Sequence, residues 1–239
     1  YTHLNPKANL IHDEIHALKT LKMSKEIRRN IYNHDTGNFD KDILIAPKNL
    51  VIYEGLHPFF LENQRSEYDL KFMVMPDEDL NHHWKIMRDK AKRGKTKKGV
   101  LKQIHKRESD FKKYIMPQVE FADVVIRPYT TKKIKDLGNS NEILDICYEL
   151  TVNIPISLDP YYEIISQFKG IKLDYKYTEN GSQNIDISGE VTPEEIEQLN
   201  TFNKRFLDDI GIVSPNFPKG VYGLVVSILI YIVINKDLY

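Results

Sequence analysis

A glutamate and a histidine stand three positions apart in a short motif, and both side chains could do chemistry. The motif is Glu54-Gly55-Leu56-His57-Pro58, and it follows the apolar run Leu50-Val51-Ile52 and Tyr53. An apolar run bounded by Gly and Pro predicts a buried strand, which here ends at Glu54. Open α/β sheets bind ligands at the carboxyl ends of their strands. Glu54 could therefore hold a Mg²⁺ water, orient a hydroxyl or hydrogen-bond a neighbouring loop.

A second candidate for ligand binding is the polar loop Tyr32–Asp40, which contains His34. The loop is dense in turn-forming residues and in side chains that hydrogen-bond. It is either a surface turn or a loop that offers hydroxyl- and phosphate-binding groups to a polar ligand, and spacing alone favours neither.

The tripeptide Gly94-Lys95-Thr96 has the ending of a P-loop but lacks the rest of that motif. A P-loop carries a glycine five residues before its second glycine, and this chain has Asp89 there, whose carboxylate would repel phosphates. The preceding segment is predicted to be a helix, whereas a P-loop follows a strand. We find no other P-loop in the 239 residues.

Positive charge is concentrated in residues 81–113, although the formal net charge of the whole chain is zero. This segment contains 13 Lys or Arg and only three Asp or Glu, so the rest of the chain is acidic. A segment of this kind is either a solvated helix face or a site for an anionic partner. A mobile basic lid that closes over phosphates would also have this composition, because cations neutralise a phosphoryl group during its transfer.

A helix predicted to begin at Pro76-Asp77-Glu78 separates the basic residues from the apolar ones. Its packed face is expected to carry Leu80, Trp84, Met87 and Ala91, at steps of four, three and four. Another face carries Lys85, Arg88 and Lys92, while Asp89 and Arg93 form an i, i+4 pair.

The remaining elements are predicted from apolar periodicity and turn signals. The first elements are a helix over Asn9–Lys25 and strands over Tyr68–Met75, Phe121–Ile126 and Ile143–Val152. The basic segment contains a flexible link over 95–102 and leads into a second lid helix over 106–118. The carboxyl-terminal part contains a hairpin of Ile171–Thr178 and Asn184–Val191 around Asn180-Gly181, followed by a helix that begins with a capping box of Thr192 and Glu195.

Composition indicates the class of protein and the compartment in which we expect it. Hydrophobic residues make up 41% of the chain and charged residues 28%, which is typical of a globular protein. The one cysteine, Cys147, cannot form an intrachain disulfide, so we expect it to be a packed residue in the cytoplasm or another reducing compartment. The longest apolar stretch, Val221–Ile234, has 14 residues. A membrane helix needs about 20, so no membrane partner is expected.

The order and spacing of several motifs over about residues 3–128 resemble the phosphoribulokinase/uridine kinase family, and the phosphoribulokinase branch more closely. The motifs are Asn5-Pro6-Lys7-Ala8-Asn9, Tyr32-Asn33-His34 with Thr36-Gly37, Glu54-Gly55-Leu56-His57-Pro58, Lys85-Ile86-Met87-Arg88-Asp89, Arg93-Gly94, Asp110-Phe111 with Tyr114-Ile115, Pro117-Gln118 and Ala122-Asp123. The resemblance implies an α/β fold of the P-loop kinase type, with a mostly parallel sheet flanked by helices. It also implies an ATP-dependent, Mg²⁺-dependent kinase that phosphorylates a hydroxyl of a pentose phosphate such as ribulose 5-phosphate, or of a nucleoside.

The resemblance assigns roles to individual positions. It implies a catalytic set of Glu54, Arg88 and Asp89, in which Glu54 is a Walker-B-like carboxylate acting with Mg²⁺ and Asp89 organises the basic cluster. It implies binding of ATP phosphates by Lys85, Arg88 and Arg93, and binding of substrate by His34, His57, Lys85, Arg93 and Arg107.

The sequence departs from the family pattern in two respects. Lys98 stands where the family usually carries a glutamate shortly after the Arg-Gly pair. The family's P-loop and the acidic general base that follows it also precede the region matched here. Because residue 1 is tyrosine rather than methionine, we expect a further N-terminal segment that carries the P-loop. The alternative is a non-catalytic subunit or a protein that binds phosphorylated metabolites.

The expected organisation has two parts. Residues 1–129 form a kinase core with a basic lid at about 81–113, and residues 130–239 form an antiparallel α+β extension packed on or extending the core sheet. Unpaired strand edges in that extension could support a homodimer. Binding of nucleic acid by the basic segment is a third reading, which we set aside because the lid accounts for the same charges and for their spacing.

Overall fold

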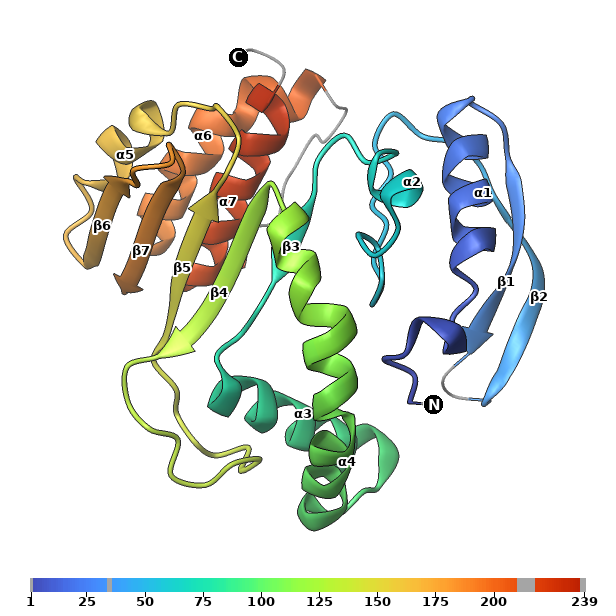
Figure 1. The fold of residues 1–239 in the computed structure, drawn as a ribbon. Helices are drawn as coiled ribbons and strands as arrows, with labels where there is room; N and C mark the ends of the chain where they lie inside the picture. Colours follow the sequence, from blue (N-terminus) through green and yellow to red (C-terminus); the bar gives the residue numbers. More distant parts are fainter. Residues whose placement is uncertain (1, 34–35, 210–217, 237–239) are drawn as a thin grey trace. The chain divides into compact units, whose positions relative to one another are not determined.

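The computed structural model describes residues 2–33, 36–209 and 218–236 (Figure 1). The chain divides into two compact units. Unit 1 comprises residues 1–69 and 107–121, and unit 2 comprises residues 70–106 and 122–239. Unit 1 is therefore built from two separate stretches of the sequence.

Unit 1 combines a helix with a two-stranded ribbon. Helix α1 (Ile11–Lys22) buries Ile11, Ile15 and Leu18 along one stripe, as their spacing predicts. Strands β1 (Ile27–Asn33) and β2 (Asn38–Ile45) pair antiparallel, and most of the described residues of the predicted polar loop lie in these strands, with Gly37 (φ +70°) between them. The short elements of the unit are η1 (Pro6–Ala8), α2 (Glu62–Arg65), the π-helical turn η2 (Phe111–Ile115) and η3 (Met116–Phe121).

The strand predicted over Leu50–Tyr53 is wrong. Residues 51–55 form neither helix nor strand, and the Ile52 side chain is 85% exposed. An apolar run becomes a strand only where a neighbouring strand completes its backbone hydrogen bonds. Among the described residues, none pairs with this run. Glu54 therefore follows an irregular segment and not the end of a strand.

Unit 2 is built on a five-stranded sheet with the order β3-β4-β5-β7-β6. Its strands are β3 (Phe72–Val74), β4 (Val124–Thr130), β5 (Ile146–Val152), β6 (Ile171–Tyr177) and β7 (Gln183–Gly189). Only β3 and β4 are parallel, so the expectation of a mostly parallel sheet is wrong. Parallel neighbours need a long crossover, which α3 (Glu78–Arg93) and α4 (Lys97–Asp110) supply between β3 and β4. The predicted hairpin of β6 and β7 is confirmed, with Gly181 at φ +85° in its turn.

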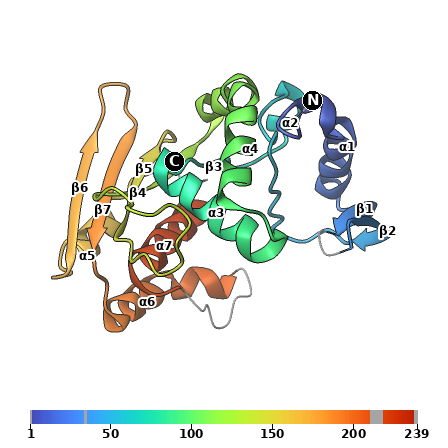
Figure 2. The ribbon, with the colours of Figure 1, turned by 90° about the horizontal axis from the view of Figure 1, so that it is seen from below.

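Helices α6 (Pro193–Asp209) and α7 (Gly220–Asn235) cover one face of this sheet (Figures 1 and 2). The predicted capping box begins α6: Thr192 N–H donates to Glu195 Oε2 (2.8 Å), and Glu195 N–H donates to Thr192 Oγ1 (3.2 Å). Cys147 is buried, as predicted, and burial raises the pKa of its thiol. In the part of the chain that the structure describes, no helix is long and apolar enough to span a membrane.

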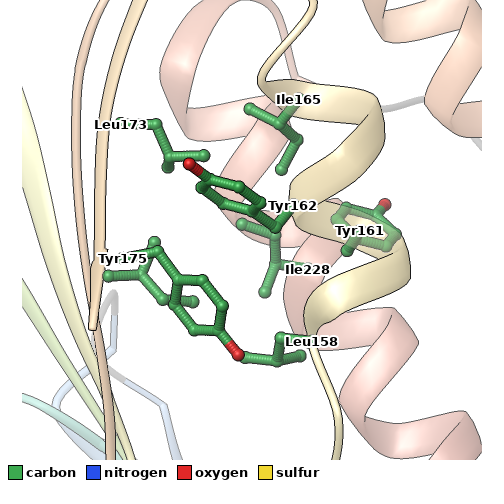
Figure 3. Close-up of a pocket in the computed structure, with 8 residues that line it drawn as sticks. Leu158, Tyr161, Tyr162, Ile165, Leu173, Tyr175 and Ile228 are labelled. Carbon is green, nitrogen blue, oxygen red and sulfur yellow. The ribbon is translucent and has the colours of Figure 1, made fainter. Parts of the chain in front are cut away.

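Helix α5 (Asp159–Ile165) packs with β6 and α7 around a small apolar cavity (Figure 3). Its volume of about 10 Å³ has room for about one water molecule, which is too little for a metabolite. Beside it, the buried hydroxyls of Tyr161 and Ser227 bond to each other, and Asn203 Nδ2 donates to Tyr161 Oη (2.9 Å). Burial raises the pKa of Tyr161 to about 12, so this satisfied polar network stays neutral and serves the core.

Candidate functional site

Helix α3 carries the predicted basic cluster, and local chemistry sets both of its ends. The Asp77 carboxylate accepts the Leu80 N–H (2.7 Å) at the first turn and also accepts the Thr130 N–H of β4 (3.1 Å). The helix ends at Gly94, whose left-handed conformation (φ +60°) turns the chain back so that Lys95 N–H donates to Asp89 O (3.1 Å).

Asp89 lies at the centre of three cations at this end of α3. Its side chain is 1% exposed. Asp89 Oδ1 lies 3.0 Å from Arg88 Nη2 and 3.3 Å from Arg93 Nη1, and Asp89 Oδ2 lies 3.7 Å from Lys95 Nζ. The predicted grouping of Arg88, Asp89 and Arg93 is thus present within unit 2. Lys95 joins it because of the turn at Gly94.

The electrostatic balance of this cluster favours an anion. Burial alone would raise the pKa of Asp89, but the hydrogen bond from Arg88 and the charges of Arg88, Arg93 and Lys95 outweigh burial and lower the pKa. The carboxylate is therefore ionised at neutral pH and leaves the cluster with a net charge of about +2. Guanidinium groups have more donors than one carboxylate can accept, so they retain N–H groups for phosphate oxygens.

The packed face of α3 differs from the predicted one. Trp84 is 37% exposed, and the buried positions are Leu80, His83, Ile86 and Asp89. The face is rotated because the irregular loop between β4 and β5 packs on it. Gly138 of that loop lies against Ile86 and donates its N–H to His83 Nδ1 (3.2 Å), and Lys90 Nζ donates to Gly138 O (3.3 Å).

Glu54 and His57 lie together in unit 1 but in different environments. Glu54 is exposed, whereas His57 is 5% exposed and neither of its ring nitrogens has a hydrogen-bond partner. Burial lowers the pKa of His57, so the ring is neutral. The Tyr53 hydroxyl lies beside the Glu14 carboxylate, which also pairs with Arg29, and burial followed by the Glu14 charge raises the pKa of Tyr53.

His34 lies outside the described residues. Arg107 lies in the part of α4 that belongs to unit 1 and is half-buried. The predicted site residues therefore fall into one set in unit 1 and one set in unit 2. In the set of unit 2, Lys85 precedes Arg88 by one turn of α3.

Glu54 fits one mode of magnesium binding. The described residues contain no group of three or more His, Cys, Asp or Glu that could enclose a metal ion. Mg²⁺ does not need such a group, because it keeps several waters and binds through one or two carboxylates and the phosphates of a substrate. An exposed single carboxylate such as Glu54 suits that mode, in which it would order the phosphates of a nucleotide.

The sequence did not single out Lys95, Gly138 or Gln118 as site residues. Lys95 belongs to the predicted basic link and to the failed P-loop match, and the turn at Gly94 is the signal that places it beside Asp89. Gln118 is the last residue of the predicted second lid helix, and its buried amide contacts the loop after Glu54. No local pattern indicates the contact that Gly138 makes.

Comparisons with known proteins place these residues in context. The model of the Phosphoribulokinase / Uridine kinase family matches residues 1–135. The chain is 40% identical over 135 residues to phosphoribulokinase of Synechocystis sp., which covers 56% of this chain and 41% of that protein. It is 30% identical over 186 residues to chloroplastic phosphoribulokinase of Chlamydomonas reinhardtii, covering 73% of this chain and 50% of that protein.

Two further similarities involve a uridine-cytidine kinase and a solved structure. The chain is 31% identical over 112 residues to uridine-cytidine kinase B of Dictyostelium discoideum, covering 46% of each. The solved structure of phosphoribulokinase from Rhodobacter spheroides superposes with a TM-score of 0.64 at 21% identity, covering 88% of this chain and 76% of that one. This likeness shows a shared fold. The chain spans half or less of the length of these curated relatives.

Proposed function

Because the chain belongs to the phosphoribulokinase/uridine kinase family, we propose that it is part of an ATP-dependent kinase that phosphorylates a hydroxyl of a pentose phosphate such as ribulose 5-phosphate. The observation that carries the proposal is the cluster on α3, where the buried Asp89 holds Arg88, Arg93 and Lys95 together. A cluster of this charge stabilises phosphate groups that exchange a phosphoryl group.

Phosphoryl transfer requires mainly that the reacting groups are positioned and that positive charge stabilises the phosphates. The bond between the γ-phosphorus and its bridging oxygen breaks, the sugar hydroxyl oxygen bonds to that phosphorus, and the hydroxyl proton leaves to a base. Lys85, Arg88 and Arg93 contact the phosphates of ATP, and Lys85 and Arg93 also contact those of the sugar. Asp89 keeps the guanidinium groups in place, because a buried anion fixes their orientation before substrate arrives.

The other residues that we assign to the reaction belong to unit 1. Glu54 is the Mg²⁺ ligand, and Mg²⁺ when bound neutralises the phosphate oxygens. His34, His57 and Arg107 bind the sugar phosphate. In functional terms we assign residues 1–129 to the kinase core, with the lid at about 81–113, and residues 130–239 to an extension. We place the protein in the cytoplasm or another reducing compartment, where the lone Cys147 stays a thiol.

The test measures ATP consumption by the purified full-length protein with ribulose 5-phosphate or with uridine, after its intact mass has been recorded. In Arg88→Gln, kcat/KM should fall about 100-fold, the usual loss for one donor that meets transition-state charge. Arg127→Gln is the matched control. Arg127 is an exposed arginine of the same unit that pairs with Glu149 at 3.6 Å, and its loss should change kcat/KM by about twofold at most.

The other outcomes point to different functions. Turnover on uridine alone would make the protein a nucleoside kinase. The absence of turnover on either substrate would refute the kinase and leave a non-catalytic protein whose basic cluster binds phosphorylated metabolites. Equal losses in the Arg88 and Arg127 variants would remove the cluster from the mechanism.

We propose in addition that the protein forms a homodimer through β6. Among the described residues, β6 pairs with β7 on one side only. In an antiparallel pair of β6 strands centred on Leu173, Lys172 of each copy would lie opposite Asp174 of the other, and opposite charges across a strand pair are stabilising. The native mass of the purified protein tests this pairing, and a monomer at micromolar concentration would refute it.

A further inference from the structure

The segment that presents Glu54 has few anchors of its own. Residues 51–55 form no regular structure, and the apolar side chains before Glu54 are exposed. On the amino-terminal side, Tyr53 is held beside Glu14. On the carboxyl-terminal side, the backbone of Leu56 and Phe59 bonds to side chains outside the segment.

Gln118, which is more than 50 residues away in the sequence, fixes that backbone. Its side chain is 2% exposed. Gln118 Oε1 accepts the Phe59 N–H (2.9 Å), and Gln118 Nε2 donates to Leu56 O (3.0 Å). These two bonds bracket His57 and Pro58, so one amide spans the loop directly after Glu54, where Arg65 Nη1 also donates to Phe59 O (3.4 Å).

A third bond fixes the amide itself. Gln118 Nε2 also donates to Tyr114 O (2.8 Å) at the π-helical turn η2, so both of its N–H groups and its oxygen are used. The aromatic rings of Tyr114 and Phe60 meet edge to face with centroids 6.1 Å apart, and Phe60 contacts the His57 ring at 5.9 Å in the same manner. The loop and the turn are therefore joined by both polar and apolar contacts.

Only an amide satisfies this site. It must accept one backbone N–H and donate to two backbone carbonyls, which a leucine cannot do at all. An ionised carboxylate of the same shape would accept the Phe59 N–H but would direct its second oxygen at two carbonyl oxygens. The type of residue at position 118 is thus set by the loop that it holds.

We propose that Gln118 is a positioning residue that holds the loop carrying Glu54 in the geometry needed for Mg²⁺ and phosphate. The inference rests on the proposed kinase function, because it assigns Gln118 an effect on catalysis through Glu54. Groups that orient a metal ligand from behind typically change metal affinity or activity 10- to 100-fold when removed, and about that loss is expected here.

The test compares two variants at Gln118 with the same variants at a control glutamine. Gln183 is also 2% exposed and also donates to a backbone carbonyl, Ile156 O at 2.6 Å, but it lies in unit 2. In Gln118→Leu, kcat should fall about 10-fold or more and the Mg²⁺ concentration for half-maximal rate should rise, whereas Gln183→Leu should keep the wild-type Mg²⁺ dependence.

The pH profile separates positioning from general loss of stability. In Gln118→Glu, the introduced carboxyl regains a donor when it is protonated, so its rate relative to wild type should rise as the pH is lowered from 8 to 6. Gln183→Glu should show no such recovery. Unchanged Mg²⁺ dependence in Gln118→Leu, or equal recovery in both Glu variants, would overturn the inference.

Hydrogen exchange at the Phe59 amide distinguishes failure of this inference from failure of the proposed function. Faster exchange in Gln118→Leu, and not in Gln183→Leu, would confirm that Gln118 holds the loop even if the wild-type protein consumes no ATP. In that case the proposed kinase function and the catalytic role of the loop would be refuted, but the structural role of Gln118 would stand. Unchanged exchange in both variants would overturn the positioning role whatever the activity.

Discussion

Alanine at Gly138 tests whether the loop between β4 and β5 fixes the basic helix α3. Gly138 has φ +81°, a conformation that a side chain disfavours. A Cβ atom there would lie 2.2 Å from Ile86 Cγ2 and 2.8 Å from Ile86 Cβ. Ile86 is fully buried, and its Cβ atom cannot move without the backbone of α3. The loop must therefore shift away from α3.

The expected cost has two parts. A left-handed backbone costs an alanine about 1 kcal/mol. Overpacking against a buried side chain adds about 1–3 kcal/mol, so unit 2 should lose about 2–4 kcal/mol in all. Gly181→Ala is the control, because Gly181 has a similar φ of +85° and a Cβ atom there would meet nothing within 4 Å. Gly181→Ala should lower the free energy of unfolding only by the cost of the left-handed backbone, about 1 kcal/mol.

Urea unfolding followed by tryptophan fluorescence measures the difference. The one tryptophan, Trp84, lies on α3, so the signal reports on the helix that Gly138 contacts. Gly138→Ala should lower the unfolding midpoint more than Gly181→Ala and should weaken the bonds of Gly138 to His83 and Lys90. Equal free-energy losses in the two variants would refute the view that the loop packs on α3 as described.

Two other predictions concern charge. The folded state lowers the pKa of Asp89, so the stability that this carboxylate contributes is present above its ordinary pKa and is lost as the pH falls through the lowered value. Asp89→Asn should lower the free energy of unfolding by about 1–2 kcal/mol at pH 7, a moderate loss because the three cations are partly exposed. In acid unfolding, the variant should lose less stability than wild type between about pH 5 and pH 2. An identical acid profile of the two proteins would contradict this prediction. Asp174→Lys should raise the dimer dissociation constant about 10-fold or more in sedimentation, and adding Lys172→Asp should restore the wild-type value. If neither substitution changes the dissociation constant, the dimer does not form through β6.

Elements whose signals are local could be predicted from the sequence. The capping box at Thr192, the Asn180-Gly181 hairpin and the start of α3 at Asp77 each depend on residues within a few positions of one another, and the structure has all three. The pair of Asp89 and Arg93 follows from helical spacing in the same way.

Elements that depend on distant partners could not be predicted. The run before Glu54 has the composition of a strand, but pairing decides whether a strand forms. The ribbon of β1 and β2 escapes prediction for another reason: its partners, such as Tyr32 and Phe39, are close in the sequence, but its mostly exposed strands have no clear alternation. The exposed position of Trp84 follows from the loop that carries Gly138, whose contact with α3 no periodicity indicates.

The two-part composition of unit 1 has a consequence for how the chain is made. The hydrogen bonds of Gln118 to the Glu54 loop and the contact of Arg65 with the Phe121 ring, 3.8 Å away, join the first 69 residues to a stretch that follows residue 106. During synthesis from the amino terminus, unit 1 cannot be completed until that stretch has left the ribosome, when β3, α3 and most of α4 have already been made. A chain that stops anywhere between residues 70 and 117 contains every residue of the Glu54 motif but lacks the amide that holds it.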